Sequence, residues 1–109
     1  MPIPNDSIRR AAVETASAII SGEVSLIEGC VRLFSLSCGL VSDWRTDPDF
    51  RVFGVVASDT DHLPTGSARS YWNVVALERE DVNIAQYEAQ ARAEVVLACQ
   101  NIVARFAGA

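Results

Sequence analysis

The last quarter of the chain carries an unbroken apolar stripe, and this stripe limits the fold more than any other feature of the sequence. Its members recur every three or four residues: Ile84, Tyr87, Ala91, Val95, Ala98, Ile102 and Phe106. That spacing puts them on one face of a helix about 23 residues, or roughly 35 Å, long. Asp81 or Asn83 can cap its start, and Asn73 can cap a separate short turn through VVALE. The stripe therefore predicts a long amphipathic C-terminal helix that other elements must cover.

Two shorter helices are predicted near the N-terminus. The first begins within residues 5–7, where Asn, Asp and Ser side chains can accept the free N–H groups of a first turn, and it stops at Gly22. The second begins at Ser25, because Ser25 and Glu28 have the spacing of a capping box, and Gly39 ends it. Since the link between them is only a few residues, we expect an antiparallel helical hairpin.

The middle of the chain allows two readings. Asp47 as a cap and Pro48 in the first turn favour a short helix over residues 48–57. The alternative is a strand, because FRVFGVV is rich in Phe, Val and Gly. A lone strand would leave its backbone groups unpaired, so the helix is the better prediction. Its inward face would consist of Phe50, Phe53, Val56 and Ala57.

These elements predict an all-α fold: an irregular small helical bundle with a long C-terminal helix and a loop-rich middle segment, in one domain over residues 1–109. The last helix is longer than the others and should extend beyond them. Its exposed apolar end would comprise Val103, Phe106 and Ala107. A second copy of the chain is one candidate to cover that end, which predicts a homodimer through the C-terminal helix.

Charge and composition narrow the choice of partner. The net charge is −5, and an acidic surface repels phosphate, which argues against nucleic acid and anionic membranes and favours a basic protein partner. All nine basic residues are arginine, as in proteins from GC-rich bacterial genomes. The N-terminus lacks the apolar core of a signal peptide, and no apolar run is long enough to span a membrane. Cys30, Cys38 and Cys99 have no metal-binding spacing and are expected to be buried reduced thiols, so we expect a cytoplasmic protein.

The segment from Ser58 to Trp72 has the highest density of reactive side chains. Asp59, Asp61 and His62 could bind a divalent metal, or His62 could act as a general base beside a carboxylate. Both hypotheses are incomplete, because the spacing lacks a fourth ligand and no nucleophile motif is present. Turn and cap chemistry is the more common role for such residues. We therefore predict no cofactor and no catalytic residue.

Two pairs of conspicuous side chains have ordinary structural explanations. Arg51 and Arg69 could bind an anionic ligand, but neutralising the aspartates between Asp43 and Asp61 is the more common role. Trp44 and Trp72 could form an aromatic binding surface, although such residues more often close a small core.

Several strings resemble a family of small bacterial proteins classified as a domain of unknown function. They are SGEVSLIEGCVRL, DPDF and SDTDHLPTG followed by a tryptophan. The family pattern falls on Gly22, Glu28, Gly29, Arg32, Ser58, Thr60, Asp61, Leu63, Pro64, Gly66 and Trp72. The resemblance covers about two-thirds of the chain, and its most specific part is a Ser-x-Thr-Asp-x-Leu-Pro-x-Gly loop. It implies no activity, and its pattern does not require a histidine at the position of His62.

Together these observations favour a non-enzymatic acidic interaction protein of the bacterial cytoplasm, such as an immunity or inhibitor protein or one that associates with itself. The expected partner-binding residues are Asp47, Asp49, Asp59 and Asp61. The Ser58–Trp72 segment is then a structural loop, in which Thr60 and Asp61 cap backbone N–H groups. Its remaining structural residues are Leu63 in the core, Pro64 and Gly66 in turns, and Trp72 over the bundle. The alternative function is a metal- or His-dependent enzyme that uses Asp59, Asp61 and His62.

Overall fold

The computed structural model describes residues 4–107, with side chains from Asp6 onward, and within that range it consists of helices joined by turns and loops, with no strand. The elements in chain order are α1 (Pro4–Ser21), α2 (Leu26–Ser37), α3 (Arg51–Asp59), the 3₁₀ helix η1 (Gly66–Tyr71) and α4 (Val74–Phe106). The predicted all-α fold with a long C-terminal helix is therefore confirmed.

α1 and α2 pack against each other as a hairpin. α1 already includes residues 5–7, so the prediction that it starts at one of them is wrong by a few residues. It ends where Gly22 adopts a φ of 83°, a left-handed conformation that favours glycine. Ser25 caps α2 as predicted, since its hydroxyl accepts the Glu28 N–H at 3.1 Å. The Glu28 carboxylate lies elsewhere and accepts the Gly66 N–H at 3.2 Å, which ties α2 to the later loop.

The middle segment forms a helix, as favoured, but the helix begins three residues later than predicted. Asp47 Oδ1 accepts the N–H groups of Asp49 at 2.9 Å and Phe50 at 3.1 Å, so Asp47 caps a turn that leads into α3. Pro48 lies in that turn, and α3 proper starts at Arg51. Phe50, Phe53 and Val56 are buried, as the helical spacing predicted, whereas Ala57 is only half-buried.

α4 is one continuous helix, so a separate start at Asp81 or Asn83 is wrong. Asn73 Oδ1 caps it by accepting the Ala76 N–H at 2.8 Å. The side chains of Asp81 and Asn83, the two residues expected to cap this helix, make other contacts. The Asp81 carboxylate binds the guanidinium of Arg69, and the Asn83 amide donates to Glu80 at 3.1 Å. The helix therefore continues through both positions.

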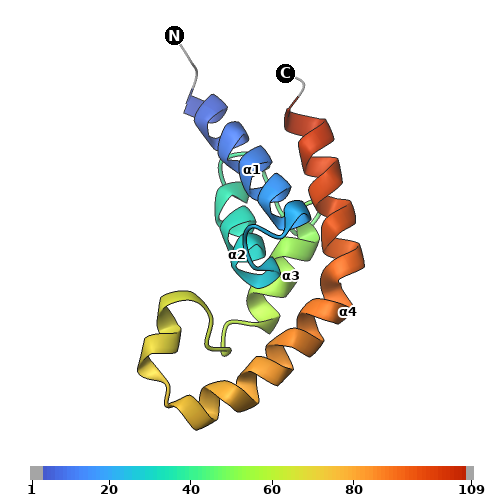
Figure 1. Ribbon diagram of the computed structural model, residues 1–109. Coiled ribbons are helices and arrows are strands. Elements are labelled where there is room, and N and C mark those ends of the chain that lie inside the picture. Colours follow the sequence, from blue (N-terminus) through green and yellow to red (C-terminus); the bar gives the residue numbers. More distant parts are fainter. Residues whose placement is uncertain (1–3, 108–109) are drawn as a thin grey trace.

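The core lies between α1, α2, α3 and the C-terminal half of α4 (Figure 1). α1 lies along α4, and α2 packs on both α1 and α3. The buried side chains that fill this space are Ala12, Ala16, Ile19, Leu26, Ile27, Cys30, Leu33, Phe50, Phe53, Val56, Leu63, Val95, Ala98, Cys99, Ile102 and Phe106.

The exposed part of α4 is its first half, opposite to the end predicted. Its C-terminal end is covered, because Phe106 is buried against Phe50 and under the guanidinium of Arg9, and Val103 is half-buried. No residue of α4 before Val95 is buried. α4 curves, and its first half leaves the bundle together with η1 (Figure 1). Ile84, Tyr87 and Ala91 of α4 still pack against the core. We therefore call η1, residues 72–73 and residues 74–83 of α4 the arm.

Candidate functional site

The loop between α3 and η1 is held by hydrogen bonds that differ from the predicted ones. The buried Thr60 hydroxyl donates to the Val56 carbonyl at 2.7 Å and does not cap an N–H group. Asp61 is exposed, and among residues 4–107 its carboxylate accepts no backbone N–H. The predicted capping by these two residues is therefore wrong, because the Thr60 hydroxyl bonds back to the last turn of α3 and the exposed Asp61 carboxylate accepts no backbone N–H in the described range.

The rest of the loop packs back against the bundle. Leu63 and Pro64 are buried, and Gly66 turns the chain with a φ of 56°. Arg69 donates to the Pro64 carbonyl at 3.2 Å and forms two hydrogen bonds with the Asp81 carboxylate. Arg69 therefore forms an internal ion pair, but its partner is Asp81 of α4 and not one of the aspartates between Asp43 and Asp61, as predicted. This pair joins the loop to α4.

This geometry predicts different effects for two loop variants. Thr60→Val should lower the free energy of unfolding by about 1 kcal/mol, because it removes a buried hydrogen bond and keeps the side-chain shape. Asp61→Ala should leave the free energy of unfolding within about 0.5 kcal/mol of wild type, as expected for an exposed side chain. Urea unfolding measures both. An Asp61→Ala loss larger than that of Thr60→Val would contradict the assignment.

The candidate metal ligands do not converge. Asp59 accepts a hydrogen bond from the Tyr87 hydroxyl at 3.0 Å. The pKa of Tyr87 is raised to about 12, mainly by burial and also by this hydrogen bond and the charge of Asp59. Asp61 and His62 lie on the surface with 3.8 Å between Asp61 Oδ1 and His62 Nδ1. Within the described part of the chain, no three His, Cys, Asp or Glu side chains are placed to hold a metal ion.

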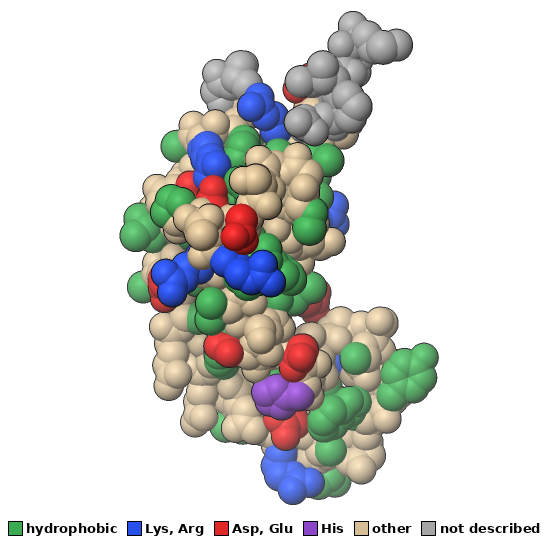
Figure 2. Space-filling view, turned by 180° about the vertical axis from the view of Figure 1, so that it is seen from behind, with side chains coloured by type: hydrophobic (Ala, Val, Ile, Leu, Met, Phe, Trp, Pro, Cys, Tyr) green, Lys and Arg blue, Asp and Glu red, His purple; other side chains and the backbone are tan. Residues whose placement is uncertain are grey.

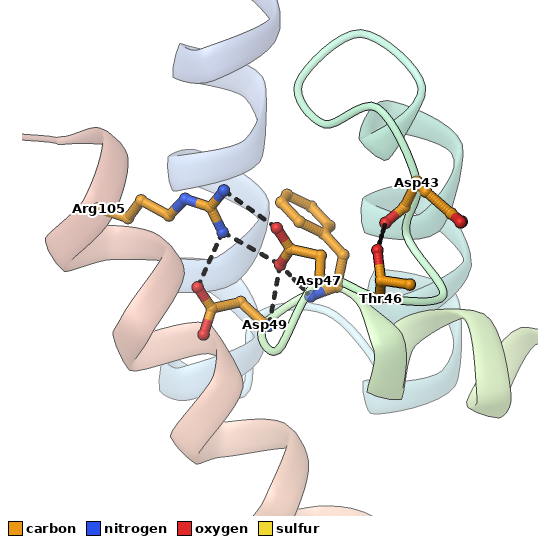
Figure 3. Close-up of polar contacts among 6 residues, drawn as sticks. Asp43, Thr46, Asp47, Asp49 and Arg105 are labelled. Atoms are coloured by element: carbon orange, nitrogen blue, oxygen red, sulfur yellow. Dashed lines mark hydrogen bonds and ion pairs between the residues drawn. The ribbon is translucent and has the colours of Figure 1, made fainter.

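Two of the predicted partner-binding aspartates are bound inside the molecule (Figure 3). Arg105 of α4 lies 3.0 Å from Asp47 and 2.9 Å from Asp49, whose side chains are only 10% and 16% exposed. Partial burial alone would raise the pKa of Asp47. Hydrogen bonds from Arg105 and from two backbone N–H groups outweigh burial and hold that pKa below its usual value. The expectation that both face a partner is therefore wrong. Arg105, and not Arg51, neutralises them.

The two tryptophans lie in different environments. Trp44 is half-buried and packs edge-on against Phe34, with ring centroids 4.9 Å apart, so it belongs to the core. Trp72 lies outside the core and is 38% exposed, so the prediction that it closes over the bundle is wrong. The reason is that the arm carries Trp72 away from the bundle.

The arm presents an apolar surface to solvent, which we call the arm patch. Tyr71 is 89% exposed and Val74 70% exposed. The complete patch consists of Tyr71, Trp72, Val74, Val75 and Val82. Figure 2 shows hydrophobic side chains at the lower right, where η1 and the start of α4 lie. Sequence reasoning missed this surface, because it assigned Val74 and Val75 to a short separate turn.

The charges beside the arm patch are mostly acidic. Two acidic residues, Glu78 and Glu80, follow Val75 on α4, and Arg79 is the basic residue between them. Asp81 and Arg69 form an ion pair and neutralise each other. Asp61 adds an exposed carboxylate in the preceding loop. The arm patch is therefore apolar with an acidic surround.

Two of the three cysteines are buried. Burial raises the pKa of Cys30 and of Cys99 to about 12, so both are protonated thiols at neutral pH. Cys38 is exposed, which corrects the expectation that all three are buried. Ser70 donates its hydroxyl hydrogen to the Ser67 carbonyl at 2.9 Å.

Comparison with known proteins gives one match. A sequence model of the family described as "Protein of unknown function (DUF2489)" matches residues 5–102. No curated protein and no solved structure matches the chain. Of the helices in the described range, none is both long enough and apolar enough to cross a lipid bilayer.

Proposed function

The chain belongs to the DUF2489 family, a family of unknown function, and we propose that it is a non-enzymatic interaction protein that binds a basic protein partner through the arm patch. The single observation that carries this proposal is the exposure of Tyr71, Val74, Val75 and Val82 on one protruding part of the molecule. Contiguous apolar side chains with a polar surround are typical of protein–protein contacts.

The choice of a basic partner follows from charge complementarity. Glu78 and Glu80 lie on the same stretch of α4 as the patch valines, Asp61 is exposed in the loop before η1, and the whole chain carries a net charge of −5. These charges attract a positively charged partner over a distance, while the apolar side chains supply most of the affinity. An inhibitor or immunity protein of the bacterial cytoplasm would bind in this way. Protonated buried thiols at Cys30 and Cys99 suit such a reducing compartment.

Site-specific photo-crosslinking in the native host tests the proposal. A photoreactive phenylalanine replaces Tyr71, which is so exposed that the change should not disturb folding. The matched control carries the same group at Ala104, an exposed position near the far end of α4. We expect position 71, and not position 104, to crosslink to one protein, which mass spectrometry identifies and whose crosslinked surface is basic.

Three outcomes would contradict the proposal. Equal crosslinking at positions 71 and 104 would show that the arm patch is not a specific surface. A crosslink to a second copy of the chain would replace the basic partner by self-association. A crosslinked partner whose contact surface is acidic would remove the argument from charge.

A further inference from the structure

A groove separates α3 from α4 on the outside of the bundle, away from the arm patch. It has a volume of about 630 Å³. Val52 and Ala98 line its inner part, and the exposed side chains of Val55 and Leu97 are its apolar rims. Arg51 and Glu94 are its charged residues. The groove therefore combines an apolar floor with one positive and one negative side chain.

The two charges lie toward opposite ends of the groove. α3 runs antiparallel to α4, because the turn before α3 is bound to Arg105 while the last residue of α3 accepts a hydrogen bond from Tyr87. Arg51, in the first turn of α3, thus lies toward the Arg105 end. Glu94 lies toward the Tyr87 end. One end of the groove therefore carries a positive charge and the other end a negative charge.

Both charges are available to a ligand. Asp47 and Asp49, the acids nearest to Arg51 in sequence, are neutralised by Arg105. Among the contacts of residues 6–107, neither Arg51 nor Glu94 takes part in an ion pair. A charged side chain of a partner could therefore pair with either one without displacing an existing contact.

We propose that this groove binds an amphipathic α-helix of a partner protein, with a basic residue over Glu94 and an acidic residue over Arg51. A helix suits a groove between two helices, because side chains of the guest can fill the depression between Val55 and Leu97. The helix dipole sets the direction. The positive N-terminal end of the guest lies by Glu94 and its negative C-terminal end by Arg51, so the guest runs parallel to α4. This site is separate from the arm patch and does not depend on it.

Two synthetic helical peptides test the proposal. Both carry three leucines on one face and a lysine near the N-terminus, and they differ only near the C-terminus, where one has glutamate and the other lysine. Amide chemical shifts of the full chain, followed by NMR during titration, locate the binding and give its affinity. We expect saturable shifts in residues 48–55 and 94–101, with about fivefold tighter binding of the glutamate peptide. Arg51→Glu should invert this preference.

Matched variants separate the groove from other effects. Arg92→Glu makes the same charge change on α4, about half a turn around the helix from Asn101, and should keep the wild-type preference. Leu97→Gln removes an exposed apolar rim and should weaken both peptides equally. Shifts concentrated in the arm, no saturation, or a preference unchanged by Arg51→Glu would overturn the proposal. Concentration-dependent shifts in the groove without peptide would also overturn it, because a second copy would then be the occupant.

Discussion

Replacing Phe50 with alanine is expected to lower the free energy of unfolding by about 4 kcal/mol, which is a large part of the total stability of a domain of this size. Phe50 is completely buried where the middle segment meets α4. Its ring packs against Phe53 and Phe106, with centroids 5.9 Å and 6.2 Å away. Alanine would leave a cavity between the middle segment and α4, which are distant in sequence, so little of it can close by local movement.

Tyr71→Ala is the matched control for this variant, because it also truncates an aromatic ring. Tyr71 is 89% exposed, so its truncation should change the free energy of unfolding by less than about 0.5 kcal/mol. Urea unfolding followed by circular dichroism measures both variants. Similar losses for Phe50→Ala and Tyr71→Ala would mean that the arm packs on the core, and the arm patch would then not be a free surface.

The second largest effect is expected for Arg105→Ala, at about 2 kcal/mol of unfolding free energy. The guanidinium is bound to Asp47 and Asp49 and lies 5.0 Å from the centroid of the Phe106 ring. Removing it leaves two largely covered carboxylates without their cation. Because the guanidinium itself is 37% exposed, water can partly replace it, and the loss stays below that of a fully buried ion pair.

The loss of unfolding free energy caused by Arg105→Ala should become smaller as the pH falls. The pKa of Asp47 is lower in the folded protein than its usual value, so its ion pair stabilises the fold at pH values above the usual carboxyl pKa of about 4. This contribution decreases as the pH falls toward the depressed folded pKa, where Asp47 becomes protonated. The difference in unfolding free energy between wild type and Arg105→Ala should therefore shrink in acid.

Arg69→Ala is the control, since it removes another arginine bound to a carboxylate, in this case on the surface. The side chains of Arg69 and Asp81 are 40% and 49% exposed, more than those of Asp47 and Asp49, so removal of this pair should cost less than Arg105→Ala at pH 7. Unfolding free energies of all three proteins between pH 3 and pH 7 provide the comparison. A difference for Arg105→Ala that stays constant over this range would show that Asp47 is not the titrating partner.

Local patterns in the sequence predicted some local features of the fold correctly, although not every helix start or cap. Ser25 caps α2 because a capping hydroxyl and the N–H group that donates to it lie three residues apart, a separation that the sequence shows directly. The burial of Phe50, Phe53 and Val56 follows from helical spacing in the same way.

Features that depend on contacts between distant segments were predicted poorly. Asp47 is 58 residues from Arg105, and nothing in the local pattern distinguishes Arg105 from the nearer Arg51 as its partner. The exposed half of α4 was assigned to the wrong end for the same reason. The stripe of α4 is continuous, and the positions of the other helices, chiefly α1, determine which half is covered.

The candidate site was therefore the least predictable part of the molecule. The acidic residues of the middle segment and His62 were conspicuous in the sequence, but Asp47, Asp49 and Asp59 are each bound to a side chain of α4. The arm patch had no motif. Val74, Val75 and Val82 are unremarkable hydrophobic residues until the helix that carries them leaves the bundle. Sequence periodicity shows that a helix has an apolar face but not which apolar residues remain uncovered.

The affinity of the protein for the partner crosslinked at position 71 tests the central claim most directly. Isothermal titration compares three forms: wild type, Val75→Glu/Val82→Glu, and Gln90→Glu/Gln100→Glu, which adds the same charge at exposed polar positions of α4. We predict at least a hundredfold loss of affinity for the valine variant, wild-type or tighter binding for the glutamine variant, and weaker binding at high salt. Equal affinities of the two double variants would contradict the assignment of the arm patch as the binding surface.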